Sequence, residues 1–369
     1  MRLLFWLALG LTAYTYFGYA SLLWCIARFH REAIPRTGEQ PSISIIMAAR
    51  NEAASLTAKL ENLKLLNYPA ERLQVIVASD GSTDQTAEIL GQHAHWITPV
   101  LLPNSGGKAR ALNEAVRFAT GDLLVFLDVR QRVDADAISE LAACFASPQV
   151  GAASGELLLV ADASASSDNG MGIYWKIEKM VRKLESASGS VVGATGAIYA
   201  VRRELYVDIP GGTILDDVFV PMNVARLGRR VVFQPSAIAR DRIFSQKGKE
   251  FSRKVRTLTG NYQLLQLAPW LLSPANPLLF RFISHKLMRL LIPFLLVLML
   301  VTSALAGGRW YQACFALQLV FYGLAAIGEF GAPNKRFKVV SIAHTFTTLN
   351  LAAAFAFYNF VAGRENVWG

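Results

Sequence analysis

Two adjacent aspartates, Asp216 and Asp217, follow the apolar pair Ile214–Leu215 and precede a segment with helical character. A carboxylate within hydrogen-bond reach of a hydroxyl group can take its proton while the hydroxyl attacks another group. Aspartates at such a position can also cap a helix or interact favourably with its dipole. Because capping explains only one of the two residues, the pair favours a general base at this point of the chain.

Polar side chains also follow three short apolar segments, 42–48, 73–78 and 123–127. Each residue alone has a structural explanation, since Asp-Gly is common in turns and an aspartate can cap the next helix. Three such strand ends at one edge of a sheet would instead form a ligand-binding rim. The polar residues at these points are Arg50 and Glu52, Asp80 and Asp84, and Asp128 and Arg130.

These apolar segments alternate with helical patterns, such as 53–66 and 86–92. Strands followed by helices predict an α/β domain with a mostly parallel, Rossmann-like sheet and helices on its faces. Parallel strands are buried on both sides, and the three segments are continuously apolar as that burial requires.

The hydrophobic fraction of 53% is high for a soluble enzyme, and the formal net charge is +10. The basic residues crowd beside apolar stretches near both ends, which suits anionic lipid headgroups better than nucleic acid. The three cysteines show no metal-binding or disulfide spacing. We therefore expect a bilayer as a partner and no nucleic acid.

Four apolar segments predict membrane spans: an N-terminal anchor within 1–28 and three helices within 287–363. A cleaved signal peptide and core helices of a soluble protein are the alternatives. Residues 38–265 are expected to form the catalytic domain, and 270–286 an interfacial helix. The basic loop 335–338 and the catalytic domain fall on the same side when the chain is threaded, which predicts a multi-pass protein of the inner membrane with a cytoplasmic domain.

The middle of the chain resembles family 2 glycosyltransferases with a GT-A fold, and its membrane layout is similar to that of bacterial polysaccharide synthases. The resemblance covers about 41–260. The blocks that carry it are 41–52, 77–84, Gly107–Asn113, Asp128, 193–197 with 202–203, Asp216–Asp217 with 226–233, and 253–256.

This resemblance implies an inverting transfer from a nucleotide sugar, with UDP the first expectation for the nucleotide. It assigns Asp217 as the base, with Asp216 where the family usually has glutamate, and Thr195 and Gly196 to the acceptor side. Asp128 becomes the ligand of Mg²⁺ or Mn²⁺. The residues expected to bind the nucleotide sugar are Ala48, Arg50, Glu52, Asp80, Lys108, Asp128, Arg130, Arg253 and Arg256.

Several basic residues in this set have alternatives. Lys108 can meet phosphate as a point charge or lie solvated in a Gly-Lys turn. Arg253 and Arg256 share a helix face and can grip the diphosphate or face lipid headgroups.

The chain departs from the family pattern at two points. Arg130 stands where a second metal-binding aspartate is expected, and an arginine can pair with phosphate but cannot ligate a metal. The glutamine and tryptophan of processive members are absent at 253–257. These departures weaken the case for strict metal dependence and for processive synthesis.

The acceptor is therefore expected to be a glycolipid, another lipid-linked molecule or a glycan such as an exopolysaccharide. One alternative is a polyprenyl-phosphate sugar synthase. The other is a non-catalytic nucleotide-binding scaffold among the subunits of a polysaccharide secretion complex.

Overall fold

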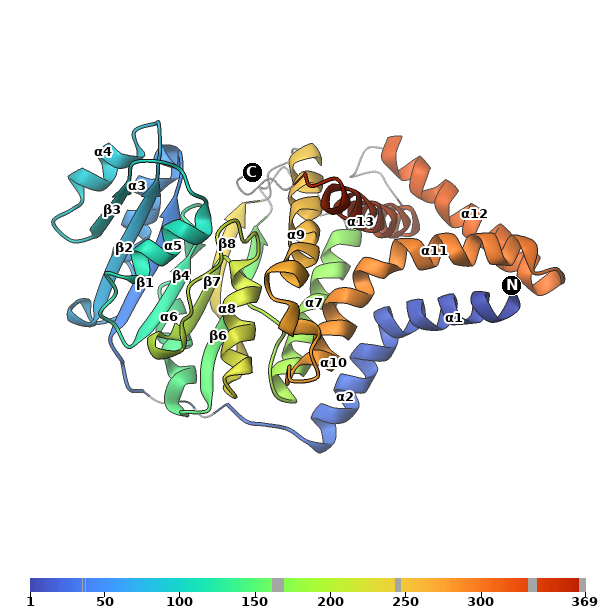
Figure 1. The fold of residues 1–369 in the computed structure, drawn as a ribbon, viewed down its shortest axis with the longest axis horizontal. Helices are drawn as coiled ribbons and strands as arrows, with labels where there is room; N and C mark the ends of the chain where they lie inside the picture. The colour runs from blue at the N-terminus through green and yellow to red at the C-terminus, as the bar shows by residue number, and fades with distance from the viewer. Residues whose placement is uncertain (35, 37, 161–168, 243–246, 331–336, 365–369) are drawn as a thin grey trace.

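The computed structural model describes the chain except residues 35, 37, 161–168, 243–246, 331–336 and 365–369. A domain built on one sheet occupies one end of the molecule, and long helices occupy the other (Figure 1). Helices α7 (Asn169–Ala187) and α9 (Lys247–Leu267) lie between these two parts.

The domain contains an eight-stranded sheet in the order β3-β2-β1-β4-β7-β6-β8-β5. Strands β1, β2, β3 and β4 pair in parallel, β7 runs antiparallel to both of its neighbours, and β6 pairs in parallel with β8. The predicted mostly parallel fold class is confirmed. The strands are β1 Ile43–Ala49, β2 Leu73–Asp80, β3 Thr98–Leu102, β4 Leu123–Leu127, β5 Arg132–Val133, β6 Val150–Val160, β7 Ile198–Arg202 and β8 Arg230–Arg242.

Helices cover both faces of this sheet. Alternate residues of β1, such as Ile45 and Ile46, enter two separate buried clusters because successive side chains of a strand point to opposite faces. Helices α5 (Lys108–Val116) and α8 (Asp216–Arg226) pack in the cluster of Ile46, whereas α3 (Ala53–Lys64) and α6 (Ala137–Ala142) pack in the other. A short helix, α4 (Thr86–Gln92), follows β2.

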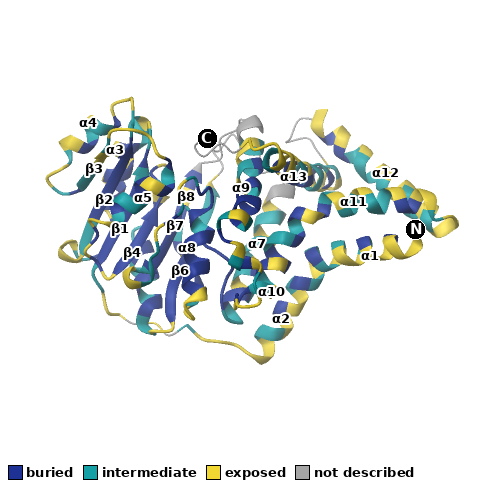
Figure 2. Cartoon of the chain, in the orientation of Figure 1, coloured by how far each residue is buried: buried dark blue, intermediate teal, exposed yellow. Residues whose placement is uncertain are grey.

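Among the described residues, four helical stretches are long and apolar enough to cross a membrane: 2–29, 279–305, 309–330 and 338–361. Many of their large apolar side chains are exposed, and exposed positions recur along these helices in Figure 2. Lys335 and Arg336 of the basic loop lie outside the described residues. The helices are α1 Arg2–Ala13, a π turn Tyr14–Gly18, α2 Tyr19–Phe29, α10 Leu279–Phe282, a π turn Ile283–Leu287, α11 Met288–Leu305, α12 Arg309–Phe330 and α13 Lys338–Val361.

The segment expected as an interfacial helix is built differently. Residues 269–272 form a 3-10 turn, and α10 continues through a π turn into α11. Its polar side chains contact α7 and the turn after it: Arg281 donates to the backbone oxygens of Glu185 and Ser190, at 2.6 and 2.8 Å. This segment therefore joins the first membrane helix of the C-terminal group to the domain.

A buried polar network completes this junction. His285 is 2% exposed and lies between two carboxylates of α7, with Nδ1 2.9 Å from Glu185 and Nε2 3.1 Å from Glu178. The Tyr19 hydroxyl donates to Glu185 at 2.6 Å, and Arg289 lies 2.5 Å from Glu178. Burial alone would raise the pKa of Glu178, but Arg289 and His285 hold it well below its usual value.

Replacing His285 with leucine should leave two buried carboxylates without this partner. Breaking a buried ionic contact on one side costs roughly 3–5 kcal/mol, so we expect His285→Leu to lower the thermal midpoint of the detergent-solubilised chain clearly. His30→Leu is the matched control, since His30 is exposed at the end of α2. Equal midpoints for the two variants would contradict the stabilising role of the network.

Candidate functional site

The loop before α5 is fixed by Asp80, at the end of β2. Asp80 is fully buried, and its carboxylate accepts hydrogen bonds from the Ser105 hydroxyl at 2.9 Å and from the backbone nitrogens of Gly106 and Gly107 at 2.8 and 2.9 Å. Gly107, with φ 92°, adopts a conformation that favours glycine. Asp80 therefore sets the position of Lys108, the first residue of α5, and its predicted contact with the nucleoside stays a prediction.

Lys108 lies among the carboxylates of the site. Its Nζ is 3.0 Å from Oδ1 of Asp128, which follows β4, and 3.2 Å from Oδ1 of Asp216, the first residue of α8. Burial would lower the pKa of Lys108, but Asp128, Asp216 and Asp217 more than offset this effect and the pKa is raised. Lys108 thus stays charged and links the end of β4 to the start of α8. Both points of the chain were predicted to carry catalytic or ligand-binding residues.

Asp217 lies beside the loop that was assigned to the acceptor side. Its Oδ2 accepts a hydrogen bond from the Gly196 nitrogen at 2.8 Å, and its backbone oxygen accepts one from Ala194 at 2.6 Å. Burial and the adjacent Asp216 raise the pKa of Asp217 to about 6, against the opposing effect of Lys108. At neutral pH Asp217 is therefore mainly a carboxylate, but one that accepts a proton readily.

Thr195 belongs to the same loop, and its backbone nitrogen donates to the Ser154 hydroxyl at 3.1 Å. The structure therefore brings the loop of Thr195 and Gly196 against the start of α8. This proximity does not by itself assign the loop to an acceptor.

Arg130, which replaces the second aspartate of the motif, is held by a carboxylate that the sequence did not single out. Its guanidinium is 3.1 Å from Asp241, a buried residue of β8, and Gln131 donates to the same carboxylate at 3.2 Å. Lys59 of α3 donates to the backbone oxygen of Gln131 at 2.7 Å. Complete burial lowers the pKa of Lys59 to about 7, with Asp128 opposing the shift.

The ends of β1 and β2 form an interlocked pair of turns. Asn51, with φ 55°, accepts a hydrogen bond from the Thr83 nitrogen at 2.8 Å. Asp84 accepts from the backbone nitrogens of Ala53 and Thr86 at 3.1 and 2.9 Å. These contacts support the structural alternative for Asp84, which positions the starts of α3 and α4.

Three other predicted residues lie along this edge of the sheet. Glu52 is half-buried, and burial raises its pKa while Arg130 opposes the shift, so Glu52 and Arg130 act on each other. Arg50 is half-buried at the end of β1, and Ala48 packs at the edge of the core on the same strand.

Arg256 and Arg253 of α9 differ in their surroundings. Burial lowers the pKa of Arg256, whereas Asp216, Asp128 and Asp217 raise it, so its charge interacts with the acidic cluster. Arg253 is exposed. The structure thus supports a place at the site for Arg256 more directly than for Arg253.

Sequence reasoning missed Tyr199. Its hydroxyl lies 3.4 Å from Oδ2 of Asp216, and its ring stacks on Phe126 of β4 with centroids 4.7 Å apart. Tyr199 lies within the apolar strand β7, and only the antiparallel pairing of β7 with β4 brings it to the site. The segment around Tyr199 carries no sequence signal for that pairing.

Asp128 offers the best carboxylate for a divalent ion. Its side chain is 36% exposed and only one of its oxygens is bound by Lys108. In the part of the chain that the structure describes, no group of three or more His, Cys, Asp or Glu side chains could hold a metal ion. Asp128 can therefore supply one carboxylate ligand, and Mg²⁺ or Mn²⁺ bound there would take its other ligands from substrate phosphates and water.

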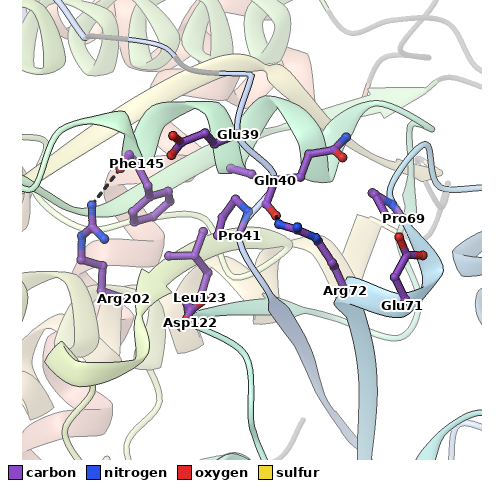
Figure 3. A pocket seen from close by; sticks show the side chains of 11 residues that line it. Glu39, Gln40, Pro41, Pro69, Glu71, Arg72, Asp122, Leu123, Phe145 and Arg202 are labelled. Carbon is purple, nitrogen blue, oxygen red and sulfur yellow. Dashed lines mark hydrogen bonds between the residues drawn. The ribbon is translucent and has the colours of Figure 1, made fainter.

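One sizeable cavity lies away from these residues. It has a volume of about 670 Å³ and opens beside the amino ends of β1, β2 and β4, whereas the site lies at their carboxyl ends (Figure 3). Ligands of open α/β sheets bind beyond the carboxyl ends of the strands. We therefore place the functional site around Lys108 and Asp217 rather than in this cavity.

Known proteins resemble this chain in sequence and in fold. Residues 44–209 match the model of a family described as glycosyl transferase family 2. Poly-beta-1,6-N-acetyl-D-glucosamine synthase of Staphylococcus aureus is 25% identical over 234 residues, which cover 62% of this chain and 56% of that protein. Beta-monoglucosyldiacylglycerol synthase of Synechocystis is 28% identical over 187 residues, covering 48% and 39%. The chain thus matches only about half the length of these relatives, or less.

A solved structure shares the whole architecture. A mannosyltransferase from Pyrobaculum calidifontis, in complex with GDP-Man and Mn²⁺, superimposes with a TM-score of 0.73 at 23% identity. The match covers 98% of this chain and 100% of that one. This likeness shows a common fold for the sheet domain and the long helices.

The buried Lys59 generates a prediction about stability. Its pKa of about 7 lies below the ordinary lysine value of 10.5, so the folded chain binds fewer protons than the unfolded chain between these two values. Stability should therefore rise with pH across this window, and Lys59→Met should remove that rise. Thermal unfolding between pH 6.5 and 9.5, with the exposed Lys64→Met as the control on the same helix, tests this. Parallel pH profiles for wild type and Lys59→Met would refute it.

Proposed function

Since this chain is a family 2 glycosyltransferase, we propose that it transfers a sugar from a nucleotide sugar, with UDP-sugars the first candidates, to a hydroxyl group of a membrane-associated acceptor. The acceptor class is a glycolipid or a growing exopolysaccharide. The catalytic domain works at the cytoplasmic face of the membrane, and subunits of a secretion complex are possible partners.

The observation that carries this proposal is the half-buried carboxylate of Asp217, which accepts a hydrogen bond from the Gly196 nitrogen at 2.8 Å and has a pKa raised to about 6. In the proposed reaction the acceptor hydroxyl attacks the anomeric carbon, and its proton passes to Asp217 as the bond to the nucleoside diphosphate breaks. A general base is most effective when its pKa lies near the working pH. A single displacement of this kind inverts the anomeric centre.

The leaving diphosphate gains negative charge, which fixed cations stabilise in a site that excludes water. Lys108 contacts Asp128 and Asp216, and Arg130 interacts with Glu52 at the same edge of the sheet, so both are placed to meet the diphosphate. Arg130 offers a guanidinium suited to two phosphate oxygens at once. Asp80, by holding the start of α5, orients Lys108 for this role.

We assign Asp128 as the protein ligand of Mg²⁺ or Mn²⁺. When bound, the ion neutralises charge on the diphosphate. With Arg130 in place of a second carboxylate, the ion depends on the donor's phosphates for most of its ligands. The structural neighbour from Pyrobaculum calidifontis is in complex with Mn²⁺, which supports a divalent ion at the site.

The two alternatives fit the site less well. The acceptor of a polyprenyl-phosphate sugar synthase is a phosphate, which is already ionised and needs no base. A non-catalytic scaffold has no use for the raised pKa of the Asp217 carboxylate. Both relatives act, by their names, in the synthesis of a glycan or a glycolipid, which supports a hydroxyl acceptor.

The first test supplies the purified full-length chain, in lipid, with a panel of nucleotide sugars and measures the nucleoside diphosphate released. We expect one donor to be consumed, and Asp217→Asn to reduce the rate by roughly 10²–10⁴-fold because it removes the base. Asp208→Asn is the control, since Asp208 is exposed. If Asp217→Asn released nucleoside diphosphate at the wild-type rate, Asp217 would not be the general base. If no donor released nucleoside diphosphate, the non-catalytic scaffold would be favoured.

The metal assignment has its own test. Asp128→Asn should raise the Mg²⁺ or Mn²⁺ concentration needed for half-maximal rate, because the single protein carboxylate is lost. Asp134→Asn is the control, as Asp134 pairs with Arg240 through contacts of 2.6 and 2.7 Å. A metal titration that is unchanged in Asp128→Asn would contradict the assignment.

A further inference from the structure

Helix α13 runs from the end of α12 to α9, which borders the catalytic domain. The π turn before α11 contacts α7 through His285. After α11, the chain turns at Gly307–Gly308 and continues as α12 (Figure 1). Near its start, α13 contacts the end of α12, where His344 lies 2.8 Å from Glu329.

The other end of α13 packs on α9. The ring of Phe360 stacks on Tyr262 with centroids 5.3 Å apart, and Ala356 packs with Val255 in one buried cluster. Arg364, just beyond the end of α13, lines a pocket together with residues of α9. The end of α13 therefore lies beside the catalytic domain.

A pocket of about 280 Å³ lies between α9 and the end of α13. Phe251, Val255 and Phe355 supply apolar walls, and Arg256 and Arg364 supply guanidinium groups. The described residues that line this pocket include no acidic side chain. Its chemistry therefore suits a molecule with an apolar part and an anionic group.

The same pocket borders the catalytic residues. Ile214 lines it and precedes Asp216 by two positions, and the Ile214 nitrogen donates to Gln263 of α9 at 3.0 Å. The charge of Arg256 acts on Asp216 and Asp217. A ligand in the pocket is thus bound next to the start of α8.

We propose that this pocket binds the acceptor, and that the acceptor is a membrane lipid with a phosphate group and a free hydroxyl. The inference rests on the proposed function, because it assigns the acceptor of that reaction. The lipid chain contacts Phe251 and Phe355, and the phosphate lies between Arg256 and Arg364. The hydroxyl reaches the anomeric carbon of the donor, gives its proton to Asp217 and displaces the nucleoside diphosphate.

Binding of three probe lipids to the full-length chain in detergent tests the phosphate requirement. Phosphatidylglycerol carries a phosphate and free hydroxyls, phosphatidic acid carries the phosphate alone, and diacylglycerol carries a hydroxyl alone. We expect the first two to bind more tightly than diacylglycerol. Arg364→Gln should weaken phosphatidylglycerol binding about tenfold, as the loss of one charge-assisted contact implies.

Arg309→Gln is the matched control, because Arg309 starts α12 at the opposite end of the helices. Equal affinity for all three lipids, or equal weakening in the Arg364 and Arg309 variants, would overturn the proposal. These binding results do not depend on any sugar transfer, so they remain decisive if the donor panel fails.

A second variant tests the acceptor role itself. Asn359→Trp fills the pocket that Asn359 lines. We expect this variant to bind the donor nucleotide sugar like wild type but to transfer sugar to lipid at least about tenfold more slowly, a change of about 1.4 kcal/mol. Wild-type transfer by Asn359→Trp would show that the acceptor binds elsewhere. Absence of donor binding in wild type would instead count against the proposed function.

Discussion

The ammonium group of Lys108 lies where the two halves of the site meet. Asp128 follows β4, and Asp216 and Asp217 begin α8 beside the loop of Thr195 and Gly196. Three carboxylates this close together would repel one another strongly in a buried site without a cation between them. Asp80, which fixes the turn before Lys108, is therefore as important to the geometry as the residues that touch substrate.

The features of this arrangement that depend on residues close together in the sequence were predictable. Strands β1, β2 and β4 are buried on both sides and are continuously apolar, so their ends, and the polar residues there, are evident in the sequence. Asp216 and Asp217 are adjacent, and the glycine-rich turn before Lys108 marks the start of a helix. The predicted α/β class follows from the same alternation of strands and helices.

The remaining features depend on contacts between distant segments. Lys108 was expected to meet phosphate, but its carboxylate partners come from other elements that only the fold brings near. Tyr199 and Asp241 reach the site through β7 and β8, whose pairing leaves no local pattern. Arg281 and His285 lie within the segment 270–286, and their hydrogen-bonding partners on α7 and the turn after it could not be found from that segment alone.

The membrane helices are joined to the catalytic domain by two kinds of contact. A buried network of charges ties α7 to α10 and α11, and apolar packing ties α9 to α13. α9 also contacts the segment that leads into Asp216, through Gln263 and Ile214. The start of α8, where Asp217 lies, is therefore positioned in part by α9, which packs on the long apolar helices.

The dependence of kcat/KM on pH, compared between wild type and Asp216→Asn, tests the central claim most directly. If Asp217 is the base, the wild-type rate should fall as the pH drops through about 6 because protonation removes its basic form. Loss of the neighbouring charge in Asp216→Asn should move this fall to lower pH. A rate that does not depend on pH in this range, or a fall that stays in place in Asp216→Asn, would contradict the account.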